Sequence, residues 1–368
     1  MGLGCLQLHN SGLFFTWQGV MLAALSLVLS IMIRWASKKM PALSRRKGDL
    51  RAVQAMHTRS TPRLGGLAIF VAIGISVLLA PLNISNRYAL FFGATTLLFV
   101  VGLAEDLGYH VSARNRLIAA IAASSLCIVL LGVWLPRLGI PLVDPWMSTV
   151  WLGVPVTLLI TSGVANGFNL IDGVNGLAGL AALTALLAMG QISSAGGYNT
   201  MVHLSMMVAA CVFGFWVVNY PWGLVFLGDA GAYTLGFVIS WFGVAILLNV
   251  PSASPWAILL TVYWPVADTL LAIYRRARRR GDVAAPDRLH VHQMMMRALE
   301  ICVLGRNRRQ LANPLTTLVL APFVCAPPVA GVLFWNQNGM AFYALLVFSV
   351  LFFCSYALAP LLITRFRR

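Results

Sequence analysis

The sequence has few charged residues and especially few acidic ones. Only ten Asp and Glu occur among 368 residues, charged residues make up 10% of the chain, and 60% is apolar. Soluble domains usually carry about 25% charged residues, so the composition excludes an ordinary soluble domain. The six cysteines are scattered and contain no CxxC pair, which indicates neither a disulfide framework nor a zinc site. The composition is that of an integral membrane protein.

Apolar runs of about 20 residues recur along the chain, and each is long enough to cross roughly 30 Å of hydrocarbon as a helix. A β-barrel would instead show short alternating segments. We therefore predict an all-α polytopic membrane protein, a single membrane domain over 1–368, with about eleven transmembrane helices and ten as the alternative. The first run has no basic region or cleavage site, so we expect it to be retained. The predicted spans are 13–33, 64–82, 88–104, 115–134, 148–165, 176–192, 201–219, 229–248, 254–274, 313–335 and 341–363.

The basic residues are distributed asymmetrically between the two sides of the membrane. Only Arg87 and Arg137 of the 26 Lys and Arg fall on one side. The positive-inside rule makes the other side cytoplasmic, with the N-terminus outside and the C-terminus cytoplasmic. The net charge of +16 is then explained by topology and anionic headgroups, with no nucleic acid as partner. The predicted cytoplasmic loops are 34–63, 105–114, 166–175, 220–228 and 275–312.

The acidic residues gather on the same side as the basic ones. Asp268 lies in a predicted span about two turns from its basic end, and only Asp144 is clearly outside. A channel or proton-coupled transporter would place ionisable groups near the bilayer midplane. This distribution favours chemistry at the cytoplasmic surface instead. The other acidic residues assigned to that side are Glu105, Asp106, Asp172, Asp229 and Asp287.

The most polar stretch within the apolar part of the chain is VANGFNLIDGVNGL, at 164–177. Asn166, Asn169 and Asp172 follow an i, i+3, i+6 spacing, so they would share one broad face of a continuing helix. Glycines follow directly and allow a close approach to a ligand. The alternative is a turn with Asn caps between two helices, although a turn needs only one or two such residues.

Two further motifs place carboxylates at helix ends. In GLAEDLG, Glu105 and Asp106 end a hydrophobic helix, where negative charge is unfavourable to the helix dipole. Such a pair suits magnesium or proton handling, and a solvated helix terminus is the alternative. In FLGDAG, Asp229 begins an apolar helix. It is either an N-cap or a carboxylate that holds a metal against a diphosphate.

Basic and histidine side chains complete the candidates. Arg63 precedes Gly65 and Gly66 at a helix start, where free N–H groups can bind phosphate. The alternative is that this stretch is only the loop before a helix. PDRLHVHQ, at 286–293, contributes Arg288, His290 and His292. These side chains could cradle a pyrophosphate or form part of a basic loop. Histidines at i and i+2 do not share a helix face, which argues against a zinc pair on a helix.

These motifs, in this order from about His57 to His292, resemble the polyprenyl-phosphate N-acetylhexosamine-1-phosphate transferase family, glycosyltransferase family 4. NGFNLIDGVNGL matches its N-x-x-N-x-x-D-G-x-x-G-L pattern, and FLGDAG matches F-x-G-D-x-G. The resemblance, nearest to the bacterial undecaprenyl-phosphate GlcNAc-1-phosphate branch, implies transfer of N-acetylhexosamine 1-phosphate from a UDP-sugar to undecaprenyl phosphate. UMP would be released, and a lipid-linked surface glycan such as O-antigen would be started at the bacterial inner membrane.

The resemblance also implies cofactors and roles for individual residues. Magnesium, with manganese as a substitute, would be held by Asn169 and Asp229. Phe226 and Asn175 would lie near the uracil. Glu105 and Asp106 would act at the phosphate end of the lipid substrate. The full set of predicted catalytic residues is Glu105, Asp106, Asp172, His290 and His292, and the predicted substrate-binding residues are Arg63, Asn166, Asn175, Phe226, Asp268 and Arg288.

Two positions depart from the family pattern. Glu105 stands where aspartate is usual, and Gln293 stands where a third histidine is common. One alternative is the peptidoglycan translocase, which acts on UDP-N-acetylmuramoyl-pentapeptide and carries consecutive histidines in this loop. The other is a transporter or non-catalytic subunit on the same scaffold, which the two departures would support. A homodimer is compatible with the sequence.

Overall fold

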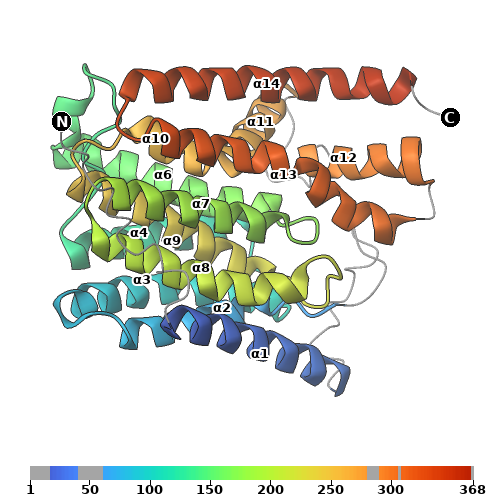
Figure 1. Ribbon diagram of the computed structural model, residues 1–368, viewed down its shortest axis with the longest axis horizontal. Coiled ribbons are helices and arrows are strands. Elements are labelled where there is room, and N and C mark those ends of the chain that lie inside the picture. Colours follow the sequence, from blue (N-terminus) through green and yellow to red (C-terminus); the bar gives the residue numbers. More distant parts are fainter. Residues whose placement is uncertain (1–16, 40–60, 280–289, 306–307, 366–368) are drawn as a thin grey trace, which may run out of the picture.

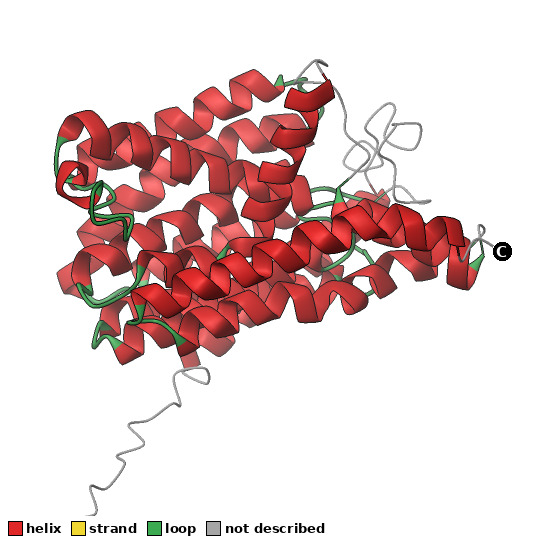
Figure 2. Ribbon diagram, turned by 90° about the horizontal axis from the view of Figure 1, so that it is seen from above, coloured by secondary structure: helices red, strands yellow, loops and turns green. Residues whose placement is uncertain are grey.

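The computed structural model describes residues 17–39, 61–279, 290–305 and 308–365. In these ranges the chain forms helices and no strand (Figure 2). The helices are α1 (Trp17–Lys39), α2 (Gly65–Leu78), α3 (Leu82–Asp106), α4 (Ala113–Leu131), α5 (Asp144–Met147), α6 (Val150–Ile171), α7 (Leu177–Ala195), α8 (Asn199–Asn219), α9 (Gly228–Asn249), α10 (Pro255–Thr261), α11 (Tyr263–Arg279), α12 (Val291–Leu299), the π-helical turn η3 (Glu300–Leu304), α13 (Arg309–Leu333) and α14 (Asn338–Arg365).

The predicted all-α membrane architecture is confirmed. Within the described ranges, nine helices are long and apolar enough to cross a membrane. The helices α10 and α11 meet at a bend of 84° and make a tenth span if the pair is counted as one. The predicted span 64–82 corresponds to α2, which has only 14 residues. It is shorter than predicted because Pro81 precedes α3 directly, and proline ends one helix and favours the start of the next.

The helix α9 lies at the centre of the bundle and is the most deeply buried of these spans. Small residues let its neighbours approach its backbone closely. A Cβ added to Gly66 of α2 would lie 2.2 Å from the Gly231 nitrogen, and one added to Gly102 of α3 would lie 2.6 Å from the Ala230 Cα. These contacts bring the start of α2 and the end of α3 to the first turn of α9.

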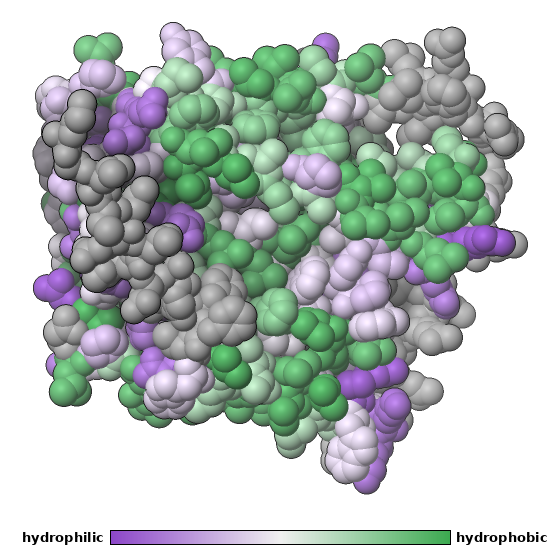
Figure 3. Space-filling model, in the orientation of Figure 1, coloured by the Kyte–Doolittle hydropathy of each residue, from purple (hydrophilic) through white to green (hydrophobic). Residues whose placement is uncertain are grey.

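The outside of the bundle is apolar, as lipid contact requires. On the face seen in Figure 3, hydrophobic residues cover much of the middle, and hydrophilic residues gather mostly towards the two ends. The helix α14 is the least buried of the spans, and its exposed side chains include Val347, Val350 and Leu351.

The polar motifs converge at one end of the bundle, on the right in Figure 1. We call it the site end, and define it by the loops 107–112, 172–176 and 220–227, which join α3 to α4, α6 to α7 and α8 to α9. The helix α6 continues to Ile171, so Asn166 and Asn169 lie on its last turns rather than in the predicted loop 166–175. Arg288 lies outside the described residues.

At the opposite end, Arg137 ties the segment after α4 to the end of α9. Its guanidinium donates hydrogen bonds to the carbonyl groups of Leu247 (2.6 Å), Val250 (3.0 Å), Pro251 (3.0 Å) and Ala253 (2.8 Å). The last carbonyls of a helix have no partner within the helix, and a cationic side chain satisfies them and the helix dipole.

We predict that Arg137→Gln lowers the midpoint of thermal denaturation in detergent by roughly 5 °C or more, because charged hydrogen bonds to buried carbonyls are lost. Arg87→Gln is the matched control, since Arg87 is an exposed arginine near the start of α3 at the same end. Equal midpoints for the two variants would show that the Arg137 contacts do not stabilise the fold.

Candidate active site

The N-terminus of α9 is capped by Asp106 from the end of α3. The backbone N–H groups of Asp229 and Ala230 donate to the two carboxylate oxygens of Asp106, at 2.9 and 2.8 Å. The Asp106 side chain is completely buried. The charge that is unfavourable at the end of α3 is therefore favourable at the start of α9, where free N–H groups and the dipole attract anions.

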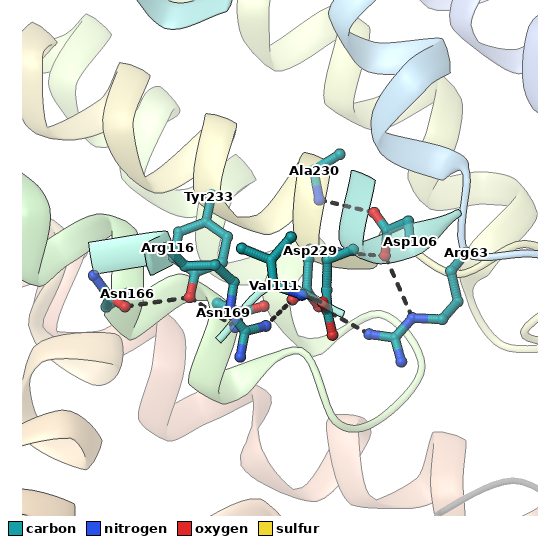
Figure 4. A network of polar contacts seen from close by, with 10 residues as sticks. Arg63, Asp106, Val111, Arg116, Asn166, Asn169, Asp229, Ala230 and Tyr233 are labelled. Carbon is teal, nitrogen blue, oxygen red and sulfur yellow. Dashed lines mark hydrogen bonds and ion pairs between the residues drawn. The ribbon is translucent and has the colours of Figure 1, made fainter. Parts of the chain in front are cut away.

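Two arginines from different elements meet Asp229 (Figure 4). The Arg63 Nη2 lies 3.0 Å from one carboxylate oxygen of Asp229, and its Nε lies 3.5 Å from Asp106. Arg116, on the first turn of α4, donates to the other carboxylate oxygen of Asp229. We call these four residues, together with Glu105 and Asp172, the arginine–carboxylate cluster.

Backbone pairing places Arg63 beside this cluster. The Phe226 N–H donates to the Pro62 carbonyl at 2.9 Å, and the Gly65 N–H donates to the Phe226 carbonyl at 2.9 Å. The Gly66 N–H donates to the Leu227 carbonyl at 2.8 Å. The segments before α2 and α9 therefore run together, so Phe226, predicted to contact the uracil, lies at the edge of the cluster.

Glu105 braces the loop that leads from α3 to α4. It is buried, and its Oε2 accepts a hydrogen bond from the Val111 N–H at 2.6 Å. The same loop ends at the start of α4, which carries Arg116. Glu105 therefore fixes the path of the chain between Asp106 and Arg116.

A directional chain of hydrogen bonds orients Asn169. The Asn166 Nδ2 donates to the Ser162 carbonyl (2.8 Å), so its Oδ1 is the atom that accepts from the Tyr233 hydroxyl (3.2 Å). The Tyr233 oxygen in turn accepts from the Asn169 Nδ2 (3.3 Å). Because amide orientation follows from such networks, the Asn169 Oδ1 faces away from Tyr233 as an acceptor.

Asp172 caps the C-terminal end of α6 and begins the turn that leads to α7. Although part of its side chain reaches solvent, the surrounding protein desolvates the carboxylate. This desolvation raises the pKa of Asp172 to about 7; Arg63 and the Gly228 N–H oppose the rise, and Asp229 adds to it. Asp172 therefore interacts with the charges of Arg63 and Asp229 in the cluster, and its carboxyl group titrates near neutral pH.

The histidine motif packs against the same turn. His290 donates through Nδ1 to the buried Asp268 (2.8 Å), and the Val291 N–H also donates to Asp268 (3.3 Å). The carboxylate of Asp268, predicted to bind substrate, therefore holds His290 and the start of α12. The His292 ring stacks on His290, with centroids 5.7 Å apart, and lies against Gly173, where a Cβ would come within 2.3 Å of its Nε2.

His292 is a neutral, buried imidazole. Desolvation lowers the pKa of His292 to about 4, against the opposing charge of Asp268. Neither ring nitrogen has a hydrogen-bond partner within the described part of the chain, and the same is true of the Oε1 of its neighbour Gln293. His290 directly precedes α12 and His292 lies on it, so the two histidines do not share one helix face.

Asn175 is buried and is held by two elements, α13 and the loop 220–227. Its N–H donates to the Asn313 Oδ1 (2.8 Å), its carbonyl accepts from the Thr317 hydroxyl (2.7 Å), and its Nδ2 donates to the Pro221 carbonyl (2.9 Å). Its Oδ1, which is buried, has no partner among the described residues. This oxygen is the atom through which the predicted uracil contact would have to be made.

Comparison with known proteins gives separate evidence from sequence similarity. The glycosyl transferase family 4 description matches residues 88–247. A probable undecaprenyl-phosphate N-acetylglucosaminyl 1-phosphate transferase of Bacillus subtilis is 27% identical over 280 residues, 75% of this chain and 77% of its own. The family description and this relative both support the resemblance to glycosyl transferase family 4.

Other relatives carry similar names. The undecaprenyl-phosphate alpha-N-acetylglucosaminyl 1-phosphate transferase of Yersinia pestis is 27% identical over 254 residues, 66% of this chain and 67% of its own. The decaprenyl-phosphate N-acetylglucosaminephosphotransferase of Mycolicibacterium smegmatis is 28% identical over 277 residues, 66% of each chain. The region matched to family 4 contains Asp106, Asn169, Asp172 and Asp229, whereas Arg63 and the histidine motif lie outside it.

The structure also adds two residues that the sequence reasoning does not single out. Arg116 is one of the many basic residues that the sequence assigns to the cytoplasmic side, yet it contacts Asp229. Tyr233 was not singled out, although it follows Asp229 by four residues and so shares its helix face. That spacing was the available signal for Tyr233, whereas nothing local distinguishes Arg116 from Arg114.

The donors at the cluster fit a magnesium ion, which prefers oxygen ligands and is bound through one or two carboxylates together with substrate phosphates. Asp229 offers a carboxylate, whose two oxygens also contact Arg63 and Arg116, and Asn169 offers an amide oxygen. Both oxygens of Asp106 already accept backbone N–H groups. Within the described residues, no three His, Cys, Asp or Glu side chains converge on a metal position, so substrate oxygens and water would complete the coordination.

We predict that Asp172→Asn removes a pH-dependent component of stability. A folded pKa of about 7 lies above the unfolded value of about 3.9, so the folded state binds the extra proton and wild-type stability falls as pH rises between these values. In detergent, the variant should denature at a higher temperature than wild type at pH 8, and this difference should shrink at pH 5. Parallel curves at all pH values would contradict the assignment.

Proposed function

We propose that this protein transfers an N-acetylhexosamine 1-phosphate from a UDP-sugar to undecaprenyl phosphate, and that this reaction starts a lipid-linked surface glycan such as O-antigen. The support is twofold. The relatives are named as polyprenyl-phosphate N-acetylglucosamine-1-phosphate transferases, and the polar groups of this chain gather at the end of a membrane bundle. A lipid phosphate and a water-soluble nucleotide can meet only at such an interface.

The observation that carries the proposal is the arginine–carboxylate cluster at the first turn of α9. It joins Arg63, Arg116, Asp106 and Asp229 through direct contacts. The whole cluster contains four carboxyl groups and two guanidinium groups, so acidic groups outnumber basic ones even when Asp172 is protonated. Such an excess suits one divalent cation that carries an anionic diphosphate.

In the proposed reaction, an oxygen of undecaprenyl phosphate attacks the β-phosphorus of the UDP-sugar. A new phosphorus–oxygen bond forms there, the bond to the bridging oxygen of UMP breaks, and UMP leaves with that electron pair. The attacking group is already an anion, so positioning and charge neutralisation are the main requirements. Arg63 and Arg116 supply fixed positive charge, and Asp172 and the histidines are the groups available to hold protons.

Magnesium, when bound, would neutralise the diphosphate, and Asp229 and Asn169 are the residues that would hold it. Asp106 orients the backbone of Asp229, and the chain through Asn166 and Tyr233 turns the Asn169 oxygen outward as a ligand. Manganese has similar oxygen-ligand preferences and is the expected substitute.

We assign the protein to the bacterial cytoplasmic membrane, with the site end facing the cytoplasm. The support is the positive-inside rule: Lys38 and Lys39 end α1 at the site end, whereas Arg87 and Arg137 belong to the other. Labelling of Ser112→Cys, in the exposed loop between α3 and α4, by an impermeant maleimide added outside intact cells would contradict this orientation.

The direct test is purified protein with undecaprenyl phosphate, magnesium and a panel of UDP-sugars, scored by UMP release. We expect turnover with a UDP-N-acetylhexosamine, and loss of turnover when magnesium is chelated. Turnover with UDP-N-acetylmuramoyl-pentapeptide alone would indicate the peptidoglycan reaction. Absence of UMP release with every donor would contradict the proposal and support a non-catalytic role.

Arg116→Gln should lower kcat/KM for the UDP-sugar about 100-fold, because a cation beside the transferring phosphate is lost. Arg114→Gln is the matched control, since Arg114 is exposed two residues earlier on the same helix. The control should remain within about twofold of wild type, in keeping with the small effect of most surface changes. Equal losses in both variants would show that net basic charge, rather than contact with Asp229, is what matters.

A further inference from the structure

The turn 172–176 is held by two side chains of α13, a helix that follows it by more than a hundred residues. Asn313 accepts the N–H of Asn175, and Thr317 donates to the carbonyl of the same residue. Asn313 and Thr317 are 3% and 2% exposed, so neither bond competes with water. The two residues are one helical turn apart and therefore share a face.

This pair forms a two-point clamp on the backbone of a single residue. Each bond is buried, and leaving a buried backbone group without its partner costs about 1–3 kcal/mol. The clamp fixes the position and the tilt of the Asn175 peptide groups, which neither bond alone would do.

A second anchor ties the turn to the loop before Asp229. Asn219, at the end of α8, accepts the Gly176 N–H (2.6 Å) and donates to the Val225 carbonyl (2.8 Å). The Trp216 indole donates to the Gly176 carbonyl (3.0 Å). The turn is therefore fixed relative to the 220–227 loop from one side and relative to α13 from the other.

The clamp also links the turn to the histidine motif. His292 on α12 lies against Gly173, and α12 continues through η3 towards α13, with Glu300 and Arg309 paired at 3.0 Å across that connection. The positions of Asp172 and His292 relative to each other are therefore fixed, because the turn and α12 are both held by the start of α13.

We propose that Asn313 and Thr317 are positioning residues for the phosphoryl transfer. They hold the 172–176 turn so that Asp172 keeps its place in the arginine–carboxylate cluster and His292 keeps its place against the turn. They act through the backbone of Asn175, and both lie outside the region matched to family 4. The catalytic part of this inference rests on the function proposed above, whereas the structural part does not.

Thr317→Val tests the clamp, because it removes the hydroxyl with almost no change of shape. Thr316→Val is the matched control: Thr316 is equally buried on the same helix, but its hydroxyl donates to the Ala312 carbonyl within α13 (2.7 Å). Thr317→Ser restores a hydroxyl and should restore the wild-type behaviour. Asn313→Ser, whose side chain is too short to reach Asn175, is an independent second variant.

Two readouts separate positioning from general stability. Hydrogen–deuterium exchange of the peptide covering 172–177 should become at least about tenfold faster in Thr317→Val and Asn313→Ser, and should be unchanged in Thr316→Val. Turnover should show a fall in kcat of about tenfold in the same two variants, with KM for the UDP-sugar within about twofold, because small displacements of catalytic groups act mainly on the reaction step.

Unchanged exchange in Thr317→Val, or equal changes in Thr316→Val, would overturn the clamp. Faster exchange with wild-type kcat would overturn its role in positioning. If wild type itself releases no UMP from any donor, the proposed function fails, and hydrogen–deuterium exchange alone then decides whether the clamp holds the turn.

Discussion

The bond between the Asp106 carboxylate and the first N–H groups of α9 is the contact on which the arrangement of this site depends. It joins the end of α3 to the start of the central helix, and small residues of α2 and α3 make the approach possible. Asp229 then occupies a fixed position, and the arginines of two other elements converge on it. A shift of α9 along its axis would separate all of these groups at once.

Two kinds of polar residue have different tasks at the site end. The charged groups of the arginine–carboxylate cluster face one another and would neutralise a metal and a diphosphate. Uncharged amide and hydroxyl groups, such as Asn219, Asn313 and Thr317, bind backbone and fix the loops. The second set costs less to bury than ionised groups would.

Much of the fold could be predicted from the sequence, because hydropathy sets the spans and alternation of sides sets which loops meet. That reasoning brought Asp106, Asp172 and Asp229 to one end, where the structure has them. It could not separate Arg116 from neighbouring basic residues, since its importance depends on a contact 113 residues away. The bend between α10 and α11, and the role of Thr317 inside an apolar helix, likewise depend on tertiary contacts that leave no periodic pattern.

In the proposed mechanism, Asp229 is where a divalent cation and a nucleotide sugar are bound together. Electron paramagnetic resonance of Mn²⁺ in the presence of UDP-N-acetylglucosamine tests this directly. We expect about one bound Mn²⁺ per chain, lost in Asp229→Asn and kept in Asp144→Asn, which changes a carboxylate at the opposite end. Binding that survives Asp229→Asn unchanged would contradict this mechanism.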